Sequence, residues 1–378
     1  MKALVVVAMI ASSAAADPIR LRADAFATTA SPAGLVTVSA DGAAGPNLSA
    51  EAVVWTGGAT VGDDTHADVL VIALRARSSD GRMGARLGRF VATLGALRPV
   101  QIDGGSVRVR LPYAFDVEAF GGMPVTLGAR AWDWTAGGRL ARRIGDAGSI
   151  GVAYMQQRDA GILAFEELGL DAGAALGKRD DLGGKLAYDL VNPGIAEISL
   201  SASHRTKALR AELYSSYRAA SHLLPATSLF SVIGDVPSER AGVTLTWHAA
   251  PRLDLISDTA VRRVDADYAP ALVLRARLKL DDRGASLVSG ELRRDGVGDA
   301  WTGARASARI ALPQAMFAST ELELVLPDRG GAWPWALVAF GWDDGTWHAA
   351  IAGEALSSPE YVHRIDMLVQ LGRRWGAP

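Results

Sequence analysis

The sequence of 378 residues contains no cysteine. Disulfide bonds, thiolate nucleophiles and cysteine-based zinc sites are therefore excluded. An excess of charge of one sign is also missing, because 39 Lys and Arg residues nearly balance 41 Asp and Glu residues and leave a formal net charge of −2. No global basic field attracts a polyanion, so we expect no nucleic-acid partner.

Long apolar runs are scarce as well. Beyond residue 16, no run approaches the roughly 20 residues that a membrane-spanning helix needs. Before it, Lys2, the apolar stretch 3–10 and the small residues 14–16 have the layout of a secretory signal peptide, to which the alternative is a buried N-terminal strand. We expect a signal peptide over residues 1–16 and an exported chain over 17–378, which without spanning helices can enter a membrane only as a closed barrel.

What the sequence does contain is segments in which apolar and polar side chains alternate with a period of two residues. Between 106 and 119, apolar side chains occupy every second position from Val107 to Val117, and charged side chains such as Arg108 and Asp116 lie between them. Such a segment predicts a β-strand with one apolar and one polar face. The same pattern returns over 197–205, 272–280, 302–310 and 364–375.

These strands predict an all-β chain folded as a single closed antiparallel transmembrane β-barrel. About 21 strand candidates are separated by turn residues, namely glycine, Asp-Gly and proline. Among them are one long strand over 104–119 and another over 125–134. Bacterial single-chain barrels have an even number of strands, and strand boundaries read from sequence are error-prone. We therefore predict about 18 strands, within a range of roughly 16 to 20.

A soluble β-sandwich, propeller or β-helix would also show short alternating strands. The apolar stripes here often thin to alanine, as at Ala304, Ala306 and Ala308, which suits lipid contact better than a tightly packed core. No propeller repeat is visible. The ten tryptophans all lie near expected strand ends, where the aromatic girdles of a membrane barrel meet the lipid headgroups. The membrane barrel is therefore favoured over the soluble folds.

The polar face of the strands predicts a lumen lined by charges of both signs, which would favour polar and charged solutes. Barrels of about 16 to 18 strands are wide enough to hold an aqueous channel. The alternative is that these charges neutralise one another in a closed, water-poor interior. The pore-lining residues predicted from alternation are Arg108, Arg110, Asp116, Glu118, Arg210, Glu212, Arg275, Arg277, Arg305 and Arg309.

Residues 219–239 form the longest stretch that alternation does not explain. Its apolar content argues against a free solvated loop. We expect it either to fold into the lumen, with Leu223, Leu224 and Phe230 as candidate constriction residues, or to form one more membrane strand with its turn.

The sequence lacks the motifs typical of metal-binding, catalytic and nucleotide-binding sites. The six histidines show no metal-ligand spacing, and there is no nucleophile elbow, phosphate loop or dinucleotide fingerprint. We therefore expect no enzyme activity, no cofactor, no metal site and no catalytic residue. His222 and His248 are the residues on which a rim hydrolase would depend.

Residues 87–119 resemble the porin superfamily and, more distantly, its alginate-export-type barrels. The resemblance is carried by Leu87-Gly88-Arg89, by Arg98 and by an Asp103-Gly104 turn before the 106–119 segment. It implies an outer-membrane channel in which Arg89, Arg98 and Arg108 are lumen or constriction residues. The chain departs from that family at Phe90-Val91, where polar residues are usual, and in ending on Gly-Ala-Pro after Trp375.

Together these features predict a porin-like channel of the bacterial outer membrane for passive diffusion of small hydrophilic solutes. Its partners would be outer-membrane lipid and those solutes, and the sequence leaves homo-oligomerisation open. The alternatives are a non-conducting structural or adhesive barrel and a barrel-rim hydrolase. An open pore would separate the first alternative from a channel, and a converging acid, base and nucleophile would indicate the second.

Overall fold

The computed structural model describes residues 19–29, 33–43, 45–59, 65–125, 133–219, 237–264, 267–296, 300–358 and 363–376. The expected signal peptide, residues 1–16, lies outside these ranges. The described residues form one sheet of 22 strands and a single 3-10 turn, η1 (Pro112–Ala114). No helix among them is long and apolar enough to span a membrane.

The strands follow one another in chain order. They are β1 (Arg20–Thr28), β2 (Ala33–Ala43), β3 (Leu48–Ala59), β4 (Thr65–Arg77), β5 (Met83–Ala92), β6 (Val100–Arg110), β7 (Phe115–Pro124), β8 (Trp134–Ile144), β9 (Gly148–Asp159), β10 (Ile162–Leu176), β11 (Asp180–Asp189), β12 (Gly194–Arg205), β13 (Leu209–Arg218), β14 (Ser238–Ala250), β15 (Leu253–Val264), β16 (Asp267–Lys279), β17 (Leu287–Asp295), β18 (Trp301–Ala311), β19 (Met316–Pro327), β20 (Trp333–Asp343), β21 (Trp347–Leu356) and β22 (Arg364–Trp375).

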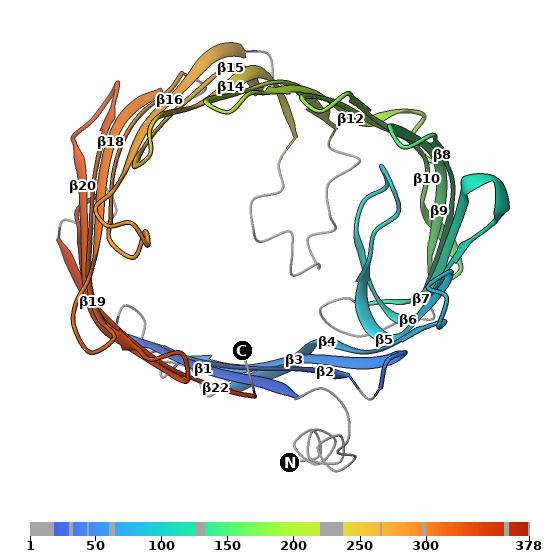
Figure 1. Ribbon diagram of the computed structural model, residues 1–378, viewed down its shortest axis with the longest axis horizontal. Helices are drawn as coiled ribbons and strands as arrows, with labels where there is room; N and C mark the ends of the chain where they lie inside the picture. Colours follow the sequence, from blue (N-terminus) through green and yellow to red (C-terminus); the bar gives the residue numbers. More distant parts are fainter. Residues whose placement is uncertain are drawn as a thin grey trace.

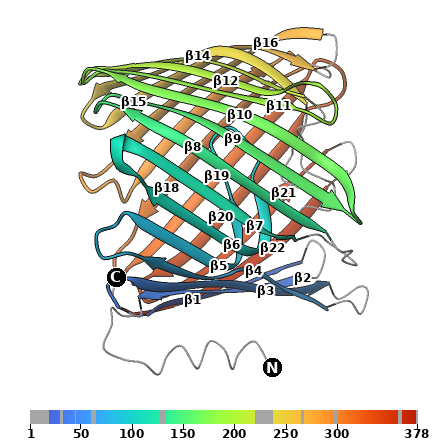
Figure 2. The same ribbon diagram turned by 90° about the vertical axis from the view of Figure 1, so that its right-hand side faces the viewer.

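Each strand pairs antiparallel with its neighbour in sequence, and β1 pairs with β22, which closes the sheet into a barrel (Figure 1). Leu21 lies opposite Trp375 across this closing pair. We call the rim that holds these two residues the near rim and the other the far rim. The strands run obliquely to the barrel axis, as closure of a sheet requires (Figure 2).

The predicted number of about 18 strands, with a range of 16 to 20, is wrong, because the closed antiparallel barrel has 22. The single strand expected over 104–119 is two strands, β6 and β7, separated by η1. This turn preserves the two-residue phase, since Val109 and Val117 lie opposite each other across the hairpin, so alternation alone could not reveal it. Most of the strand expected over 125–134 lies outside the described residues, because 126–132 are not among them, and β8 begins at Trp134.

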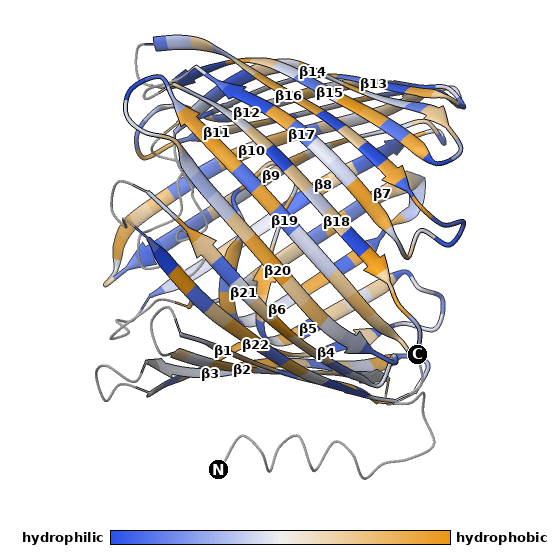
Figure 3. Cartoon of the chain, turned by 90° about the vertical axis from the view of Figure 1, so that its left-hand side faces the viewer, coloured by the Kyte–Doolittle hydropathy of each residue, from blue (hydrophilic) through white to orange (hydrophobic). Residues whose placement is uncertain are grey.

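The alternating pattern separates an apolar outer face from a polar inner face. Leu213, Val338 and Ile365 are 60%, 61% and 79% exposed, although they are large and apolar. Bands of opposite hydropathy alternate along the strands in Figure 3. Such exposure would be costly in water and is expected where the outer face contacts lipid.

Exposed tryptophans lie near strand ends at both rims. Trp247, Trp342, Trp347 and Trp375 lie at near-rim ends of their strands, and Trp134 lies at a far-rim end. This is the arrangement of aromatic girdles at the two membrane interfaces. Trp335 differs, because its indole Nε1 donates to Glu354 at 2.5 Å.

Candidate functional site: the lumen and its docked hairpin

The residues predicted to line a pore lie on the inner side of the wall, opposite the lipid-facing positions. Several are engaged in ion pairs there, as the alternative of mutual neutralisation anticipated. These pairs are Arg210 with Glu212, Arg275 with Glu291 and Arg305 with Glu321. Arg309 and Arg277 form no such pair with a described carboxylate. The Arg309 guanidinium instead lies over the ring of Phe317, 4.1 Å from its centroid.

Arg108, Arg110, Asp116 and Glu118 meet near the η1 turn, at the near rim. Arg108 Nε lies 3.3 Å from Asp116 and 3.5 Å from Glu118, and Arg110 Nε lies 3.9 Å from Asp116. The side chains of both arginines are nevertheless half exposed. The charges are therefore paired and also accessible from the lumen, and their role in lining a pore stays a prediction.

The hairpin of β5 and β6 leaves the barrel wall and points into the lumen (Figure 1). β5 pairs with β4 only as far as Ile72 opposite Arg89, although β4 continues to Thr65. The bend coincides with glycines in directly opposing positions on three strands, Gly88, Gly104 and Gly122. We call this line of glycines the crease.

Only glycine fits the crease. Gly88 has φ +127°, and a Cβ there would lie 2.0 Å from the carbonyl oxygen of Ile72. A Cβ on Gly104 would lie 2.2 Å from the Gly121 carbonyl oxygen, so the backbones of β6 and β7 approach more closely than side chains allow. The Asp103-Gly104 turn expected from sequence is therefore wrong, because both residues lie within β6.

The tip of the hairpin, residues 93–99, docks on the inner face of β7 to β10. Leu94 and Leu97 are buried in an apolar cluster that includes Phe120 of β7 and Met155 of β9. The close fit continues at Gly169 of β10, where a Cβ would lie 3.0 Å from Leu97. A small hydrophobic core thus forms inside the lumen and holds the tip against one side of the wall.

Arg98 anchors the tip. Its Nε donates to the Glu167 carboxylate at 2.7 Å, and the side chains of the two residues are 6% and 0% exposed. The Arg98 guanidinium also lies 4.3 Å from the ring centroid of Phe165. Arg98 is therefore buried beneath the tip and does not face water, and its role as a lumen or constriction residue stays a prediction.

Arg89 lies where β5 separates from β4. Its guanidinium donates to Asp103 at 2.7 and 2.9 Å and to Asp68 at 2.9 Å. It also donates to the Val69 carbonyl oxygen at 2.8 Å, and Gln101 donates to the neighbouring Leu70 carbonyl at 2.7 Å. These side chains bond carbonyl groups on the part of β4 that β5 has left.

Asp80 stabilises the near-rim turn between β4 and β5. Its carboxylate accepts hydrogen bonds from the Ser78 hydroxyl at 2.5 Å and from the Arg82 backbone N–H at 3.0 Å. The Ser78 hydrogen bond, helped by the second, holds the pKa of the Asp80 carboxyl below its usual range. The turn sets Arg77 of β4 opposite Gly84 of β5.

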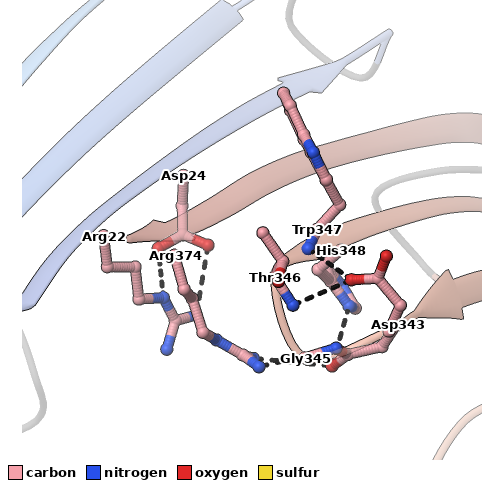
Figure 4. A network of polar contacts seen from close by, with 9 residues as sticks. Arg22, Asp24, Asp343, Gly345, Thr346, Trp347, His348 and Arg374 are labelled. Atoms are coloured by element: carbon pink, nitrogen blue, oxygen red, sulfur yellow. Dashed lines mark hydrogen bonds and ion pairs between the residues drawn. The ribbon is translucent and has the colours of Figure 1, made fainter. Parts of the chain in front are cut away.

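Polar contacts also cross the seam where the barrel closes. Arg22 of β1 and Arg374 of β22 lie directly opposite each other. Asp24 accepts from Arg22 at 2.6 and 3.1 Å, and Asp343 lies 3.4 Å from Arg374 (Figure 4). Each arginine therefore has its own carboxylate, which offsets the repulsion between two like charges in facing positions.

The predicted constriction residues Leu223, Leu224 and Phe230 lie outside the described residues, as does His222. Alternation does not predict that the tip at 93–99 enters the lumen, and it assigns no role in the site to Glu167. A signal for the tip is present: Leu94 and Leu97 make this connection apolar, which is the property that argued against a solvated loop at 219–239.

Catalytic and metal-binding groups are sparse on the described wall. His248 Nδ1 lies 2.5 Å from Asp254, and His204 Nδ1 lies 2.6 Å from Asp180; the histidine side chains of both pairs are half exposed. The described residues hold no group of three or more His, Asp or Glu residues that could hold a metal ion.

Comparison with known proteins gives a fold without a family. No protein-family model matches the sequence, and no curated protein matches it. The PapC usher translocation pore of the E. coli P pilus matches 96% of this chain over 100% of its own length, with TM-score 0.55 and 12% identity. A variant of the ferric enterobactin receptor PfeA from Pseudomonas aeruginosa matches 95% of this chain and 81% of its own, with TM-score 0.62 and 9% identity. The siderophore receptor PirA from the same organism has TM-score 0.60, 12% identity and coverages of 95% and 80%.

The fold is that of a bacterial outer-membrane barrel. The outer-membrane location expected from sequence is thereby confirmed, and it agrees with the apolar outer face. At 9 to 12% identity the likeness shows the fold alone and does not extend to what these proteins carry. The resemblance to the porin superfamily stays a prediction.

Proposed function

We propose that the protein is a passive outer-membrane channel for small hydrophilic solutes and not an enzyme. The observation that carries this proposal is a closed barrel whose inner face bears accessible charged side chains of both signs, while its outer face is apolar. A water-filled lumen solvates such side chains, and barrels of more than about 16 strands are wide enough to contain one.

The docked hairpin belongs to this proposal as a fixed partial obstruction. Its tip is held by an apolar cluster and by the buried pair of Arg98 and Glu167, so it occupies one side of the lumen and leaves the wall of β14 to β20 uncovered by it. A channel built in this way is narrowed by its own chain. The proposal also includes outer-membrane lipid as the partner of the apolar face.

The test is single-channel conductance of the refolded chain in a planar bilayer. Heat-modifiable gel mobility checks folding first. We expect discrete open steps, and larger steps when residues 93–99 are replaced by Asn-Gly, which suits a tight hairpin turn between Ala92 and Val100. A folded barrel that never conducts would overturn the channel, and unchanged steps in the shortened hairpin would overturn its role as the obstruction.

A further inference from the structure

A half-enclosed chamber of about 580 Å³ lies between the docked hairpin and the near-rim connection of β2 and β3. Residues 92–94 of the hairpin, residues 45–47 of the connection and the start of β3 bound it, and the inner faces of β4 to β7 form its wall. Its size is within the range of pockets that hold small molecules.

Four arginines line this chamber, and they stand in two rows across the strands. In one row, Arg75 of β4 lies directly opposite Arg86 of β5. In the other, Gly84 of β5 lies between Arg77 of β4 and Arg108 of β6, which are its two direct cross-strand neighbours. Like charges in facing positions repel, so this arrangement needs negative charge to stabilise it.

The carboxylates of the described residues do not fully supply that charge. Glu51 pairs with Arg75 and Arg86 together. Around the second row, Asp116 and Glu118 are shared, because Asp116 also lies near Arg110, and Glu118 lies 3.6 Å from Arg139. Asp171 pairs with Arg139 at 2.5 Å. The cluster therefore holds six guanidinium groups against four carboxylates, and no described carboxylate lies within ion-pair distance of Arg77.

The space between Arg77 and Arg108 is open. A Cβ on Gly84 would meet a single neighbouring atom within 4 Å, the carbonyl oxygen of Ala76 at 3.9 Å. In the other row, Arg86 Nε is buried and has no hydrogen-bond partner in the described part of the chain. The chamber thus combines an excess of planar guanidinium donors with unfilled room beside them, a combination suited to carboxylate and phosphate groups.

We propose that this chamber is a binding site for small oxyanionic solutes, with the anion seated over Gly84 between Arg77 and Arg108. The inference rests on the proposed function, because a solute reaches the chamber through an open lumen. It adds a substrate class to that function: solutes bearing carboxylate or phosphate groups are retained in the channel, and neutral sugars pass without a site.

The test is calorimetric titration of the refolded full chain in non-ionic detergent micelles at low ionic strength, with inorganic pyrophosphate as the probe and sucrose as the neutral comparison. We expect saturable pyrophosphate binding with a Kd of about 1 mM or below, and none for sucrose. Gly84→Asp places a carboxylate in the open space, so it should weaken binding by roughly tenfold or more, as should Arg77→Ala combined with Arg108→Ala.

Two matched variants separate charge from shape. Gly84→Asn has the size of Gly84→Asp without the charge, and Arg277→Ala removes an inner-face arginine of β16, outside the chamber. Arg277→Ala should bind pyrophosphate much as the unchanged chain does, and Gly84→Asn, which fills the same space without a charge, should weaken binding clearly less than Gly84→Asp does. No saturable binding to the unchanged chain, or equal binding by Gly84→Asp and Gly84→Asn, would overturn the site. A barrel that conducts without binding refutes this inference alone, and one that binds without conducting refutes the channel alone.

Discussion

Arg98 and Glu167 form a buried ion pair inside the lumen, beside the apolar cluster of the tip. Removing one partner of such a pair leaves an uncompensated buried charge at a cost of about 3 to 5 kcal/mol. The loop of seven residues that carries Arg98 can escape this cost by leaving the wall. We therefore expect Arg98→Ala to undock the tip without unfolding the barrel, whose strand ladder does not depend on the pair.

Undocking can be measured with a single spin label, because the chain has no cysteine of its own. Thr93 is exposed on the docked tip, so Thr93→Cys provides a labelling site there. The label should be restricted in the parent and mobile after Arg98→Ala. Arg98→Met with Glu167→Leu, which removes both charges, should restore most of the restriction. A label that stays restricted in Arg98→Ala would show that the apolar cluster alone holds the tip.

At the scale of elements, the crease explains how a hairpin of one continuous sheet turns into the lumen. Gly104→Ala would drive a Cβ against the backbone of β7, whereas a Cβ on adjacent Gly105 would make ordinary contacts at 3.5 and 3.7 Å. We expect Gly104→Ala to lower the free energy of unfolding by about 1 to 3 kcal/mol and Gly105→Ala to change it little. Urea titration followed by heat-modifiable mobility measures both. Equal midpoints for the two variants would contradict the crease as a close backbone approach.

The same elements show what the sequence could and could not predict. Alternation predicted the all-β barrel, because it depends on neighbours along one strand. It missed the division at Pro112–Ala114, where a turn kept the phase, and the family resemblance took Gly104 for a turn residue although it lies within β6. The contact of Arg98 with Glu167 joins residues 69 apart in sequence, and no local pattern relates them.

At the scale of the whole molecule, every strand of the barrel has one face toward lipid and the other toward the lumen. Val338 lies at the middle of β20 and is 61% exposed on the outer face, whereas the adjacent Ala339 faces the lumen beside Ser319 and Ala352. An arginine at the bilayer midplane costs about 2 to 4 kcal/mol, while an arginine in an aqueous lumen is solvated. The same substitution at consecutive residues should therefore have very different consequences.

We expect Val338→Arg to lower the free energy of unfolding in lipid vesicles by about 2 to 4 kcal/mol and Ala339→Arg to leave it nearly unchanged. Urea unfolding followed by tryptophan fluorescence measures both variants against the parent. Because a slip of one residue would exchange the two faces along the whole strand, the reverse order of stabilities would show that the register of β20 is wrong. Equal, large losses would show instead that the lumen beside β20 excludes water, and the channel would then have to be abandoned in favour of a closed, structural barrel.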